Sequence, residues 1–331
     1  MSIFGDAPPR AWANAFLQGI PYARESGMVA DDLGHAKATV SMPARDAWTG
    51  DAARQQLHPG CLTVLADTAC GLAVGAAMNP IEPFATLDLR MDYLRPARAG
   101  LGLICVAHCH RLSRSVAFVR GELFQPGVDD AVATVNATFM LGTANQRRTD
   151  MGTARAAAPL PEGQVSLPSA ALPVPRPVPS ISTGEPWSAP TTPCEPALPA
   201  GVSPYVDFLA LRRLPGSDPS VGDLFQLPFH PHLIGNPVLP ALHGGVVAGF
   251  AESAAVLHLA FSNGITGGPG PRGVDFAIDY LRSAKPVDTW ARCTTVRQGS
   301  RVALVQVNVW QDDPTRPIVS ARSHCLLPKE G

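Results

Sequence analysis

The sequence predicts an α+β fold made of two tandem domains, each a long helix wrapped by an antiparallel sheet. Three observations predict it. Similar phrases recur in the same order half a chain apart, each copy contains one long apolar segment, and each such segment precedes several runs that alternate between apolar and polar residues. A helix packed on an antiparallel sheet is a stable layer arrangement. We expect the two copies to pair within the chain, with one sheet continuous across both.

The internal repeat is the strongest of these signals, because its offset drifts by only a few residues. The matching phrases are HPGCLTVLADTA at 58–69 with HGGVVAGFAESA at 243–254, MDYLRPAR at 91–98 with IDYLRSAK at 278–285, RSVAFVRGELFQ at 114–125 with SRVALVQVNVWQ at 300–311, and PY at 21–22 and 204–205.

A proline-rich segment separates the copies. Residues 159–204 hold 13 of the 34 prolines, and such a stretch favours extended conformations over regular ladders. We therefore expect a first domain over residues 1–145, a linker over 146–200 and a second domain over 201–331. Trp187 is atypical of a linker and suggests that part of this segment packs on a domain.

Each copy shows the same order of expected elements. A short helix (RAWANAFLQG in the first copy) and a strand near 33–42 precede a long apolar helix that begins near 59 or 244. In ATLDLRMDYL, every second residue from Leu87 to Tyr93 is apolar, which is typical of a strand with one buried face. The further strands are expected in LGLICVAHCHRL, SVAFVRGELFQ, AVATVNATFML, VDFAIDYL, TWARCTTVRQ, RVALVQVNVWQ and IVSARSHCLL.

Composition limits the classes of function. Of the 331 residues, 46% are hydrophobic and 16% charged, and the net charge of −1 gives no general attraction for nucleic acid or an anionic membrane. Seven scattered cysteines favour reduced thiols and a cytoplasmic location. The first residues lack a secretory pattern, and the apolar runs are interrupted, so we expect neither a signal peptide nor a membrane-spanning helix.

One acid in each apolar helix is a candidate catalytic group. Asp67 and Glu252 each follow a histidine, His58 or His243, by nine residues, too deep in the helix for an N-cap. A buried carboxylate is costly without partners, so each is a candidate base or nucleophile. The start of such a helix presents unpaired N–H groups that can stabilise a developing oxyanion, as acyl transfer to water requires.

These phrases resemble the hotdog-fold acyl-CoA thioesterases of the PaaI-like group, in both halves of the chain. The resemblance implies that the N–H of the glycine after the histidine polarises the thioester carbonyl. It also implies that the helical acid of the opposite domain attacks or activates water, and that a Ser or Thr at the next strand assists. The substrate would be an acyl-CoA, without a cofactor or metal, and pairs of such units commonly associate into homo-oligomers.

Cross-pairing of the copies would make two unequal sites. One would join Gly244 and His243 to Asp67 and Thr86, with every role filled. The other would join His58 to Glu252, but Pro59 has no N–H and Gly273, in the place of Thr86, has no hydroxyl. We therefore expect one competent and one degenerate site per chain.

Several other residues are candidates for substrate contacts. Asn236 stands near the place where family members carry a water-positioning amide, and the basic residues that recur beside the second strand phrase could pair with phosphates: Arg95, Arg98, Arg282 and Lys285. In CVAHCHR at 105–111 the cysteines and histidines would point to opposite faces of a strand, which argues against a metal site. GGPGPRG at 267–273 lacks the context of a phosphate loop and is expected to connect helix to strand.

Alternatives remain open. The acids could be structural, and the histidines could only hold their loops. A non-catalytic acyl-CoA or acyl-carrier binding protein would fit Pro59 and Gly273. A hotdog enoyl-CoA hydratase is suggested by IGNPVLPALH, although Ile234 occupies the expected aspartate position.

Overall fold

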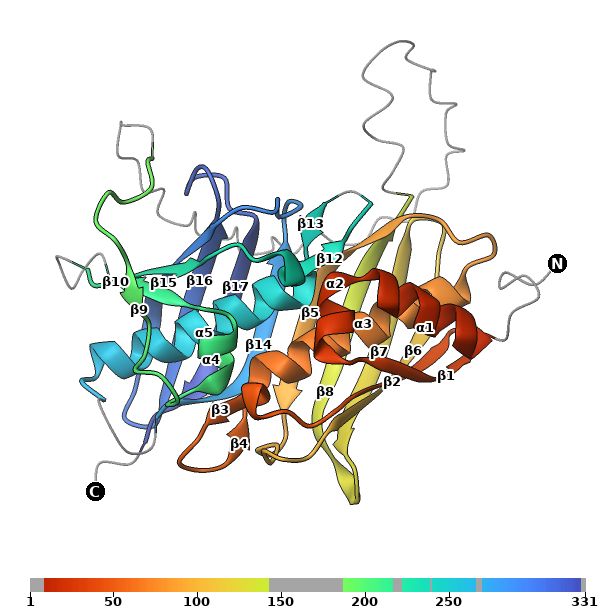
Figure 1. Ribbon diagram of the computed structural model, residues 1–331, viewed down its shortest axis with the longest axis horizontal. Helices are drawn as coiled ribbons and strands as arrows, with labels where there is room; N and C mark the ends of the chain where they lie inside the picture. The colour runs from red at the N-terminus through yellow and green to blue at the C-terminus, as the bar shows by residue number, and fades with distance from the viewer. Residues whose placement is uncertain (1–8, 143–186, 217–221, 239, 266–269, 329–331) are drawn as a thin grey trace, which may run out of the picture.

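The computed structural model describes residues 9–142, 187–216, 222–238, 240–265 and 270–328 (Figure 1). A sheet of 13 antiparallel strands runs through both copies, with two long helices across one face. These helices are α3 (Pro59–Ala77) and α5 (Gly244–Ser262), which begin where the repeat predicts. The expected layer arrangement and the continuous sheet are confirmed.

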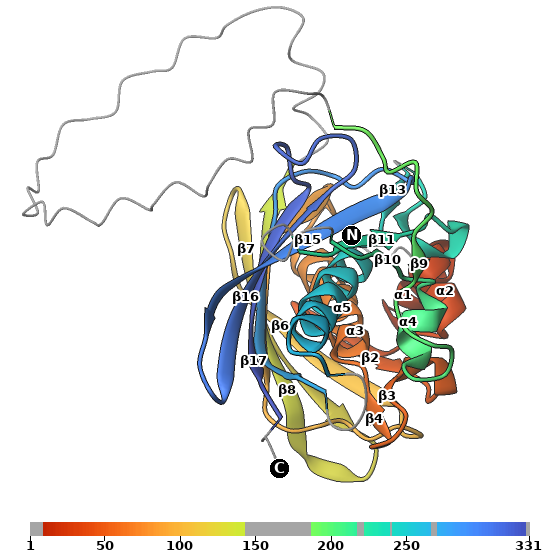
Figure 2. The ribbon, with the colours of Figure 1, turned by 90° about the vertical axis from the view of Figure 1, so that its left-hand side faces the viewer.

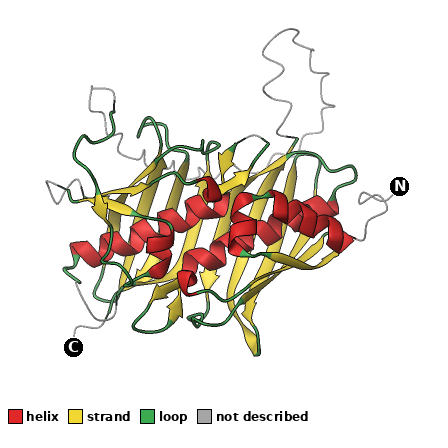
Figure 3. Ribbon diagram, viewed as in Figure 1, coloured by secondary structure: helices red, strands yellow, loops and turns green. Residues whose placement is uncertain are grey.

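The sheet is the sum of two similar halves (Figure 3). The first half, in spatial order, contains β1 (Val29–Gly34), β2 (Lys37–Met42), β6 (Leu103–Leu112), β7 (Val116–Gln125), β8 (Val128–Leu141) and β5 (Phe84–Tyr93). The second continues with β14 (Arg272–Tyr280), β17 (Val319–Leu326), β16 (Val302–Trp310), β15 (Thr289–Gln298), β11 (Leu224–Leu227), β10 (Arg212–Leu214) and β9 (Glu195–Pro196). The antiparallel pairing of β5 with β14 joins the halves.

Short elements form a third layer on the far side of the long helices from the sheet (Figure 2). The helices are α1 (Pro9–Gly19), α2 (Pro21–Ser26) and α4 (Pro204–Phe208), with the 3-10 turns η1 (Asp46–Trp48) and η3 (Pro231–Leu233). Two small hairpins precede the long helices: β3 (Thr49–Asp51) with β4 (Gln56–Leu57), and β12 (Ile234–Asn236) with β13 (Ala241–Leu242).

Two strand expectations need correction. The single strand expected near 33–42 is a hairpin of β1 and β2, whose turn places Ala36 at a positive φ of 60°. The strict alternation expected along 85–94 is broken in β5 by a bulge between Thr86 and Asp88. In β6 the two cysteines are buried and His108 and His110 are exposed, as expected.

The β5 bulge has a consequence for the site. Because Leu87 is the extra residue, Thr86 lies opposite the buried Phe139 and therefore on the helix-facing side of the sheet. Strict alternation with Leu89 would have turned Thr86 outward. The same irregularity in β14 puts Gly273 opposite the buried Cys325. Thr86 and Gly273 therefore occupy equivalent positions in the two copies.

The long helices pack closely because small residues line their crossing. A Cβ built on Gly249 would lie 3.4 Å from the Gly60 Cα atom and 2.6 Å from the Tyr205 hydroxyl. By length and composition both helices could span a membrane, contrary to our expectation, but 89% and 72% of their apolar windows are buried inside the protein. Their uniform apolarity is explained by burial on all sides.

Part of the predicted linker packs on the second copy. Trp187 contacts Trp290 and Trp310 edge-on at 5.6 and 5.9 Å between ring centroids, and β9 adds an edge strand to β10. Residues 143–186 lie outside the described part of the chain, so the linker expectation stays a prediction there.

The helix crossing gives a first test. Gly249→Ala should lower the free energy of unfolding by about 1–3 kcal/mol, because the new methyl group would overlap the buried Tyr205. The matched control is Gly75→Ala in α3, where a Cβ meets nothing within 4 Å and alanine favours the helix by up to about 1 kcal/mol. Urea denaturation measures both, and equal stability of the two variants would contradict this packing.

Candidate active site

Two equivalent clusters lie where the start of one long helix meets the middle of the other. In each, the acid comes from one copy of the domain and the helix start from the other. The structure thus brings together the residues that the sequence assigned to each cross-paired site. We call them the Asp67 site and the Glu252 site.

In the Asp67 site the carboxylate receives hydrogen bonds from both copies. The Thr86 hydroxyl donates to Oδ1 at 3.0 Å, and the Gly245 backbone N–H donates to Oδ2 at 2.9 Å. The side chain is 8% exposed. Both bonds stabilise the charged form of the acid. The Gly245 bond adds to the expectation, since the resemblance named only the first glycine after the histidine.

The first turn of α5 leaves one N–H available. Gly245 donates to Asp67, while Val246 and Val247 both donate to the His243 carbonyl at 3.0 and 3.1 Å. Within the described residues, no acceptor is found for the Gly244 N–H. A Cβ on Gly244 would lie 3.1 Å from Asp67 Oδ2, so this amide lies beside the carboxylate.

The two histidines are helix N-caps. His243 Nδ1 accepts from the Gly245 N–H at 3.1 Å and His58 Nδ1 accepts from the Gly60 N–H at 3.0 Å. Burial lowers the pKa of His58 to about 3 and also lowers the pKa of His243, although Asp67 opposes the second shift. Both rings are thus neutral at pH 7, with the proton on Nε2.

Each Nε2 faces the hydroxyl that follows the acid of the other copy. His243 is 3.2 Å from Thr68 Oγ1, and His58 is 3.3 Å from Ser253 Oγ. Each histidine ring also packs against a tyrosine of the repeated PY phrase. The ring centroids of Tyr22 and His243 lie 5.5 Å apart, and those of Tyr205 and His58 lie 4.5 Å apart. These contacts fix both helix starts against the other copy.

The Glu252 site is arranged differently. Glu252 is fully buried; Oε2 accepts from the Thr63 hydroxyl at 3.3 Å, and Oε1 has no partner among the described residues. Thr63 Oγ1 also lies 3.0 Å from the Tyr93 hydroxyl. Burial raises the pKa of Glu252 to about 8, against the lowering effect of Tyr93 and Thr63. Glu252 is therefore mostly protonated at neutral pH.

The helix start in the Glu252 site offers no free N–H. Pro59 has none, the Gly60 N–H is taken by His58 Nδ1, and the Cys61 N–H donates to the His58 carbonyl at 3.0 Å. Proline at the first helical position suits the helix but removes the amide that Gly244 presents in the other site.

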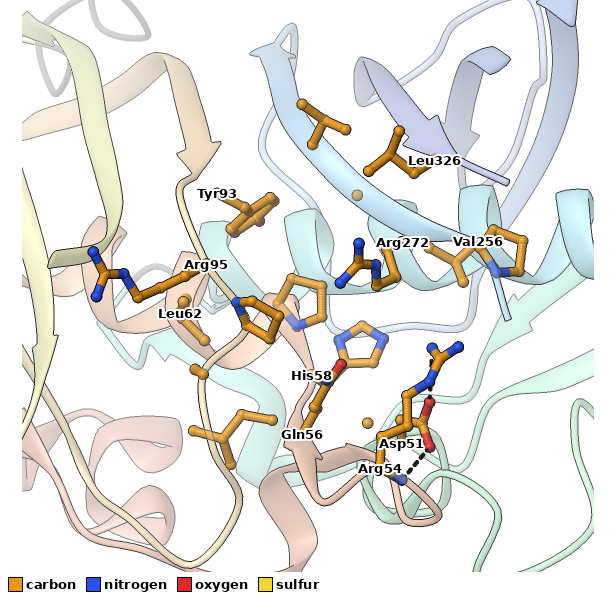
Figure 4. A pocket seen from close by; sticks show the side chains of 18 of the residues that line it. Asp51, Arg54, Gln56, His58, Leu62, Tyr93, Arg95, Val256, Arg272 and Leu326 are labelled. Atoms are coloured by element: carbon orange, nitrogen blue, oxygen red, sulfur yellow. Dashed lines mark hydrogen bonds and ion pairs between the residues drawn. The ribbon is translucent and has the colours of Figure 1, made fainter. Parts of the chain in front are cut away.

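A cavity of about 280 Å³ opens at the Glu252 site (Figure 4). His58, Pro59 and Tyr93 line it together with Gly273, and apolar side chains such as Leu62 and Val256 cover its walls. A Cβ on Gly273 would lie 3.7 Å from Glu252 Oε1. The absence of a side chain at this position leaves the unpaired oxygen close to the cavity.

The predicted rim residues are all exposed. Arg95 lines the cavity but pairs with Asp130 at 2.7 Å. Arg282 donates to the Pro317 carbonyl at 2.8 Å, while Arg98 and Lys285 are tied through their backbones to Gln125 and Gln311. Asn236 follows a bulge in β12, and its side-chain oxygen accepts from the Val238 N–H at 3.0 Å. None of these contacts assigns a substrate role.

Several site residues escaped the sequence interpretation although the repeat contained them. Tyr93 and Tyr280 are the tyrosines of the DYLR phrase, and the Tyr280 hydroxyl donates to the Gly244 carbonyl at 3.0 Å. Thr68 and Ser253 are the hydroxyl residues that directly follow the two acids. Thr63 had no signal, because Ala248 replaces it in the second copy.

Comparison with known proteins agrees with this geometry. The family model of the thioesterase superfamily matches residues 55–131 and again 239–318, once in each copy. The chain belongs to the thioesterase superfamily. It is a thioester hydrolase with two hotdog domains in tandem.

The relatives differ in how much of the chain they cover. The medium/long-chain acyl-CoA thioesterase YigI of Salmonella typhimurium is 29% identical over 142 residues, which is 38% of this chain and 89% of the relative. A crystal structure from Novosphingobium aromaticivorans has a TM-score of 0.60 at 17% identity and covers 91% of this chain and 98% of its own. A hotdog-fold protein from Alicyclobacillus acidocaldarius has a TM-score of 0.53 at 13% identity, covering 88% of this chain and 94% of its own. These two structures share the fold across both copies.

No metal site accompanies these clusters within the described residues, where no group of three or more His, Cys, Asp or Glu side chains could hold an ion. The seven cysteines are free and buried. For the loop expected at 267–273, residues 267–269 lie outside the described part, and β14 begins at Arg272.

The raised pKa of Glu252 predicts a pH-dependent stability. Between its ordinary value of 4.5 and its folded value of about 8, the folded state keeps a proton that the unfolded state has lost. The free energy of unfolding should therefore fall by about 1.4 kcal/mol per pH unit in this window. Glu252→Gln, which is neutral throughout, should become progressively more stable than wild type from about pH 5 to about pH 7.5. Urea denaturation, with Glu122→Gln as an exposed control, measures this; a constant difference would contradict a neutral Glu252.

Proposed function

We propose that this protein hydrolyses acyl-CoA thioesters at the Asp67 site. The observation that carries the proposal is the Gly244 N–H, which has no acceptor among the described residues and lies beside a carboxylate from the other copy. This pair supplies the two groups that acyl transfer to water needs. The acyl-CoA substrate is supported by the similarity to YigI, a medium/long-chain acyl-CoA thioesterase.

The proposed reaction begins with the thioester carbonyl oxygen accepting from the Gly244 N–H. Asp67 then takes a proton from a water molecule that attacks the carbonyl carbon, or attacks that carbon itself to form a mixed anhydride that water hydrolyses. In either route the carbon–sulfur bond breaks, coenzyme A leaves as a thiolate that takes up a proton, and the acyl group is released as a carboxylate. Negative charge on the carbonyl oxygen is stabilised by the Gly244 amide and the positive end of the α5 dipole. Thr86 and the Gly245 N–H hold the carboxylate in place. His243 accepts from the Gly245 N–H and so keeps the first turn of α5 in place, and it transfers no proton in this scheme.

In this proposal the Glu252 site does not hydrolyse substrate. It lacks the donor that Gly244 provides, and its acid is mostly protonated, which removes the base. Loss of one oxyanion donor alone typically costs about 10²–10³ in kcat. The chain would then have one competent site.

The remaining expectations stay predictions: no cofactor, a cytoplasmic location, and association of two or more chains into a homo-oligomer. The pairing of CoA phosphates with Arg95, Arg98, Arg282 and Lys285 also stays a prediction.

The two acids give the first test of the assignment. Asp67→Asn should lower kcat by about 10³ or more, because it removes the base or nucleophile. Glu252→Gln should retain most of the activity. The measurement is coenzyme A release from short, medium and aromatic acyl-CoAs at neutral pH. Equal losses in both variants, or a loss only in Glu252→Gln, would refute the asymmetric assignment.

The amide donor gives the second test. Gly244→Pro should lower kcat about 10²–10³ below Gly244→Ala, because both add a Cβ but only proline removes the N–H. Proline is compatible with this helix position, since Pro59 occupies it in α3. If the two variants hydrolyse acyl-CoA at the same rate, the Gly244 N–H is not the oxyanion donor.

A further inference from the structure

The cavity at the Glu252 site continues into a second one of about 390 Å³. Both are lined by Arg54, Gln56, Arg272 and Leu326, and the second adds Arg301. We call the two adjoining cavities the channel, and we call its inner end the part of the first cavity that Tyr93 and Gly273 line; apart from Arg95, three arginines line one or both cavities. We call these residues, Arg54, Arg272 and Arg301, the arginine cluster.

Members of the arginine cluster differ in how they are engaged. Arg54 is paired with Asp51 at 3.3 Å, from the loop before β4, while Arg272 extends from β14 between His58 and Val256 (Figure 4). No side-chain partner is found for Arg272 or Arg301 within the described residues. Arginine recognises phosphate and carboxylate oxygens in paired hydrogen bonds, and three arginines suit an anion with several charges.

The arginine cluster is specific to the Glu252 site. The repeat places Leu239, Ala85 and Ser115 at the corresponding positions of the other copy. The last of these correspondences is fixed by structure, since Leu327 donates to the Arg301 carbonyl as Leu141 donates to the Ser115 carbonyl. The site without a free helix amide is therefore the one with three additional cations.

A buried acid, Glu252, lies near the inner end of the channel. Glu252 is fully buried, its Oε1 atom has no partner in the described residues, and a Cβ built on Gly273, which lines the first cavity, would lie 3.7 Å from that atom. An unpaired buried carboxyl oxygen is costly. As a neutral acid it could donate a hydrogen bond to a carbonyl oxygen in the channel without activating water.

We propose that the Glu252 site binds a second coenzyme A thioester and does not hydrolyse it. Its phosphates meet the arginine cluster, its carbonyl oxygen accepts from Glu252, and its chain lies along the apolar walls. The identity of the ligand rests on the proposed substrate class of the Asp67 site. The binding site itself rests on the channel, the arginine cluster and Glu252.

The experiment counts binding sites without hydrolysis. Wild-type chain is titrated calorimetrically with a ketone analogue of decanoyl-CoA, in which a methylene group replaces the thioester sulfur. We expect two equivalents per chain. Arg272→Ala with Arg301→Ala should weaken one equivalent by about tenfold or more and leave the other unchanged. The control for net charge removes two exposed arginines of β6 and β7, as Arg111→Ala with Arg120→Ala, and should change the affinity of neither equivalent.

A second pair of variants tests the inner end. Gly273→Leu extends into the channel and should abolish one equivalent, whereas Gly273→Ala adds a Cβ with only ordinary contacts and should keep both. One equivalent in wild type, or two that ignore the arginine substitutions, would overturn the proposal. Arginine-dependent binding of decanoate alone, equal to that of the analogue, would overturn it in favour of a free fatty acid.

Activity is read separately as coenzyme A release from decanoyl-CoA. A chain that binds two equivalents but releases none contradicts the proposed function and leaves the second site standing. A chain that hydrolyses the thioester but binds one equivalent supports the proposed function and contradicts the second binding site.

Discussion

The hydrogen bond from the Gly245 N–H to Asp67 Oδ2 is the contact on which the rest of this structure depends. At 2.9 Å it joins the first turn of α5 to the middle of α3, and so joins the two copies at their most polar point. A carboxylate in an apolar helix needs donors and a helix start needs acceptors, and this bond between the copies supplies both. Small residues at the crossing make this approach possible, and the repeated tyrosines hold the two capping histidines against it.

The two sites differ in the hydrogen bonds that their acids accept. Asp67 has two donors, one from a hydroxyl and one from a backbone amide of the other copy. Glu252 has the Thr63 hydroxyl as a donor and one unpaired oxygen: Gly273, in the place of Thr86, has no hydroxyl, and the Gly60 N–H donates to His58 only. Asp67 keeps 8% of its surface exposed and Glu252 keeps none, and it is burial that raises the pKa of Glu252.

Much of the fold was predictable because the chain contains two copies of one domain that can be compared with each other. Two copies aligned on each other gave the starts of α3 and α5, and the four principal strands of each half. The joining of both acids to the opposite helix start was implied by family resemblance. The hairpin of β1 and β2 and the bulge at Leu87 were not predictable, since both depend on which partner strand a residue meets. The bulge mattered most, because alternation alone turns Thr86 away from Asp67.

The residues that sequence reasoning missed share a physical cause. Tyr93, Tyr280 and Thr63 act through contacts between segments far apart in the chain, and the channel at the Glu252 site is a property of several segments at once. The arginine cluster is visible only when its members are seen to converge, since Arg54, Arg272 and Arg301 belong to three unrelated stretches. A copy that had merely lost its catalytic groups would gain no advantage from collecting cations around an open channel. Loss of the amide at Pro59 together with these additional arginines is better explained by a change of task than by decay.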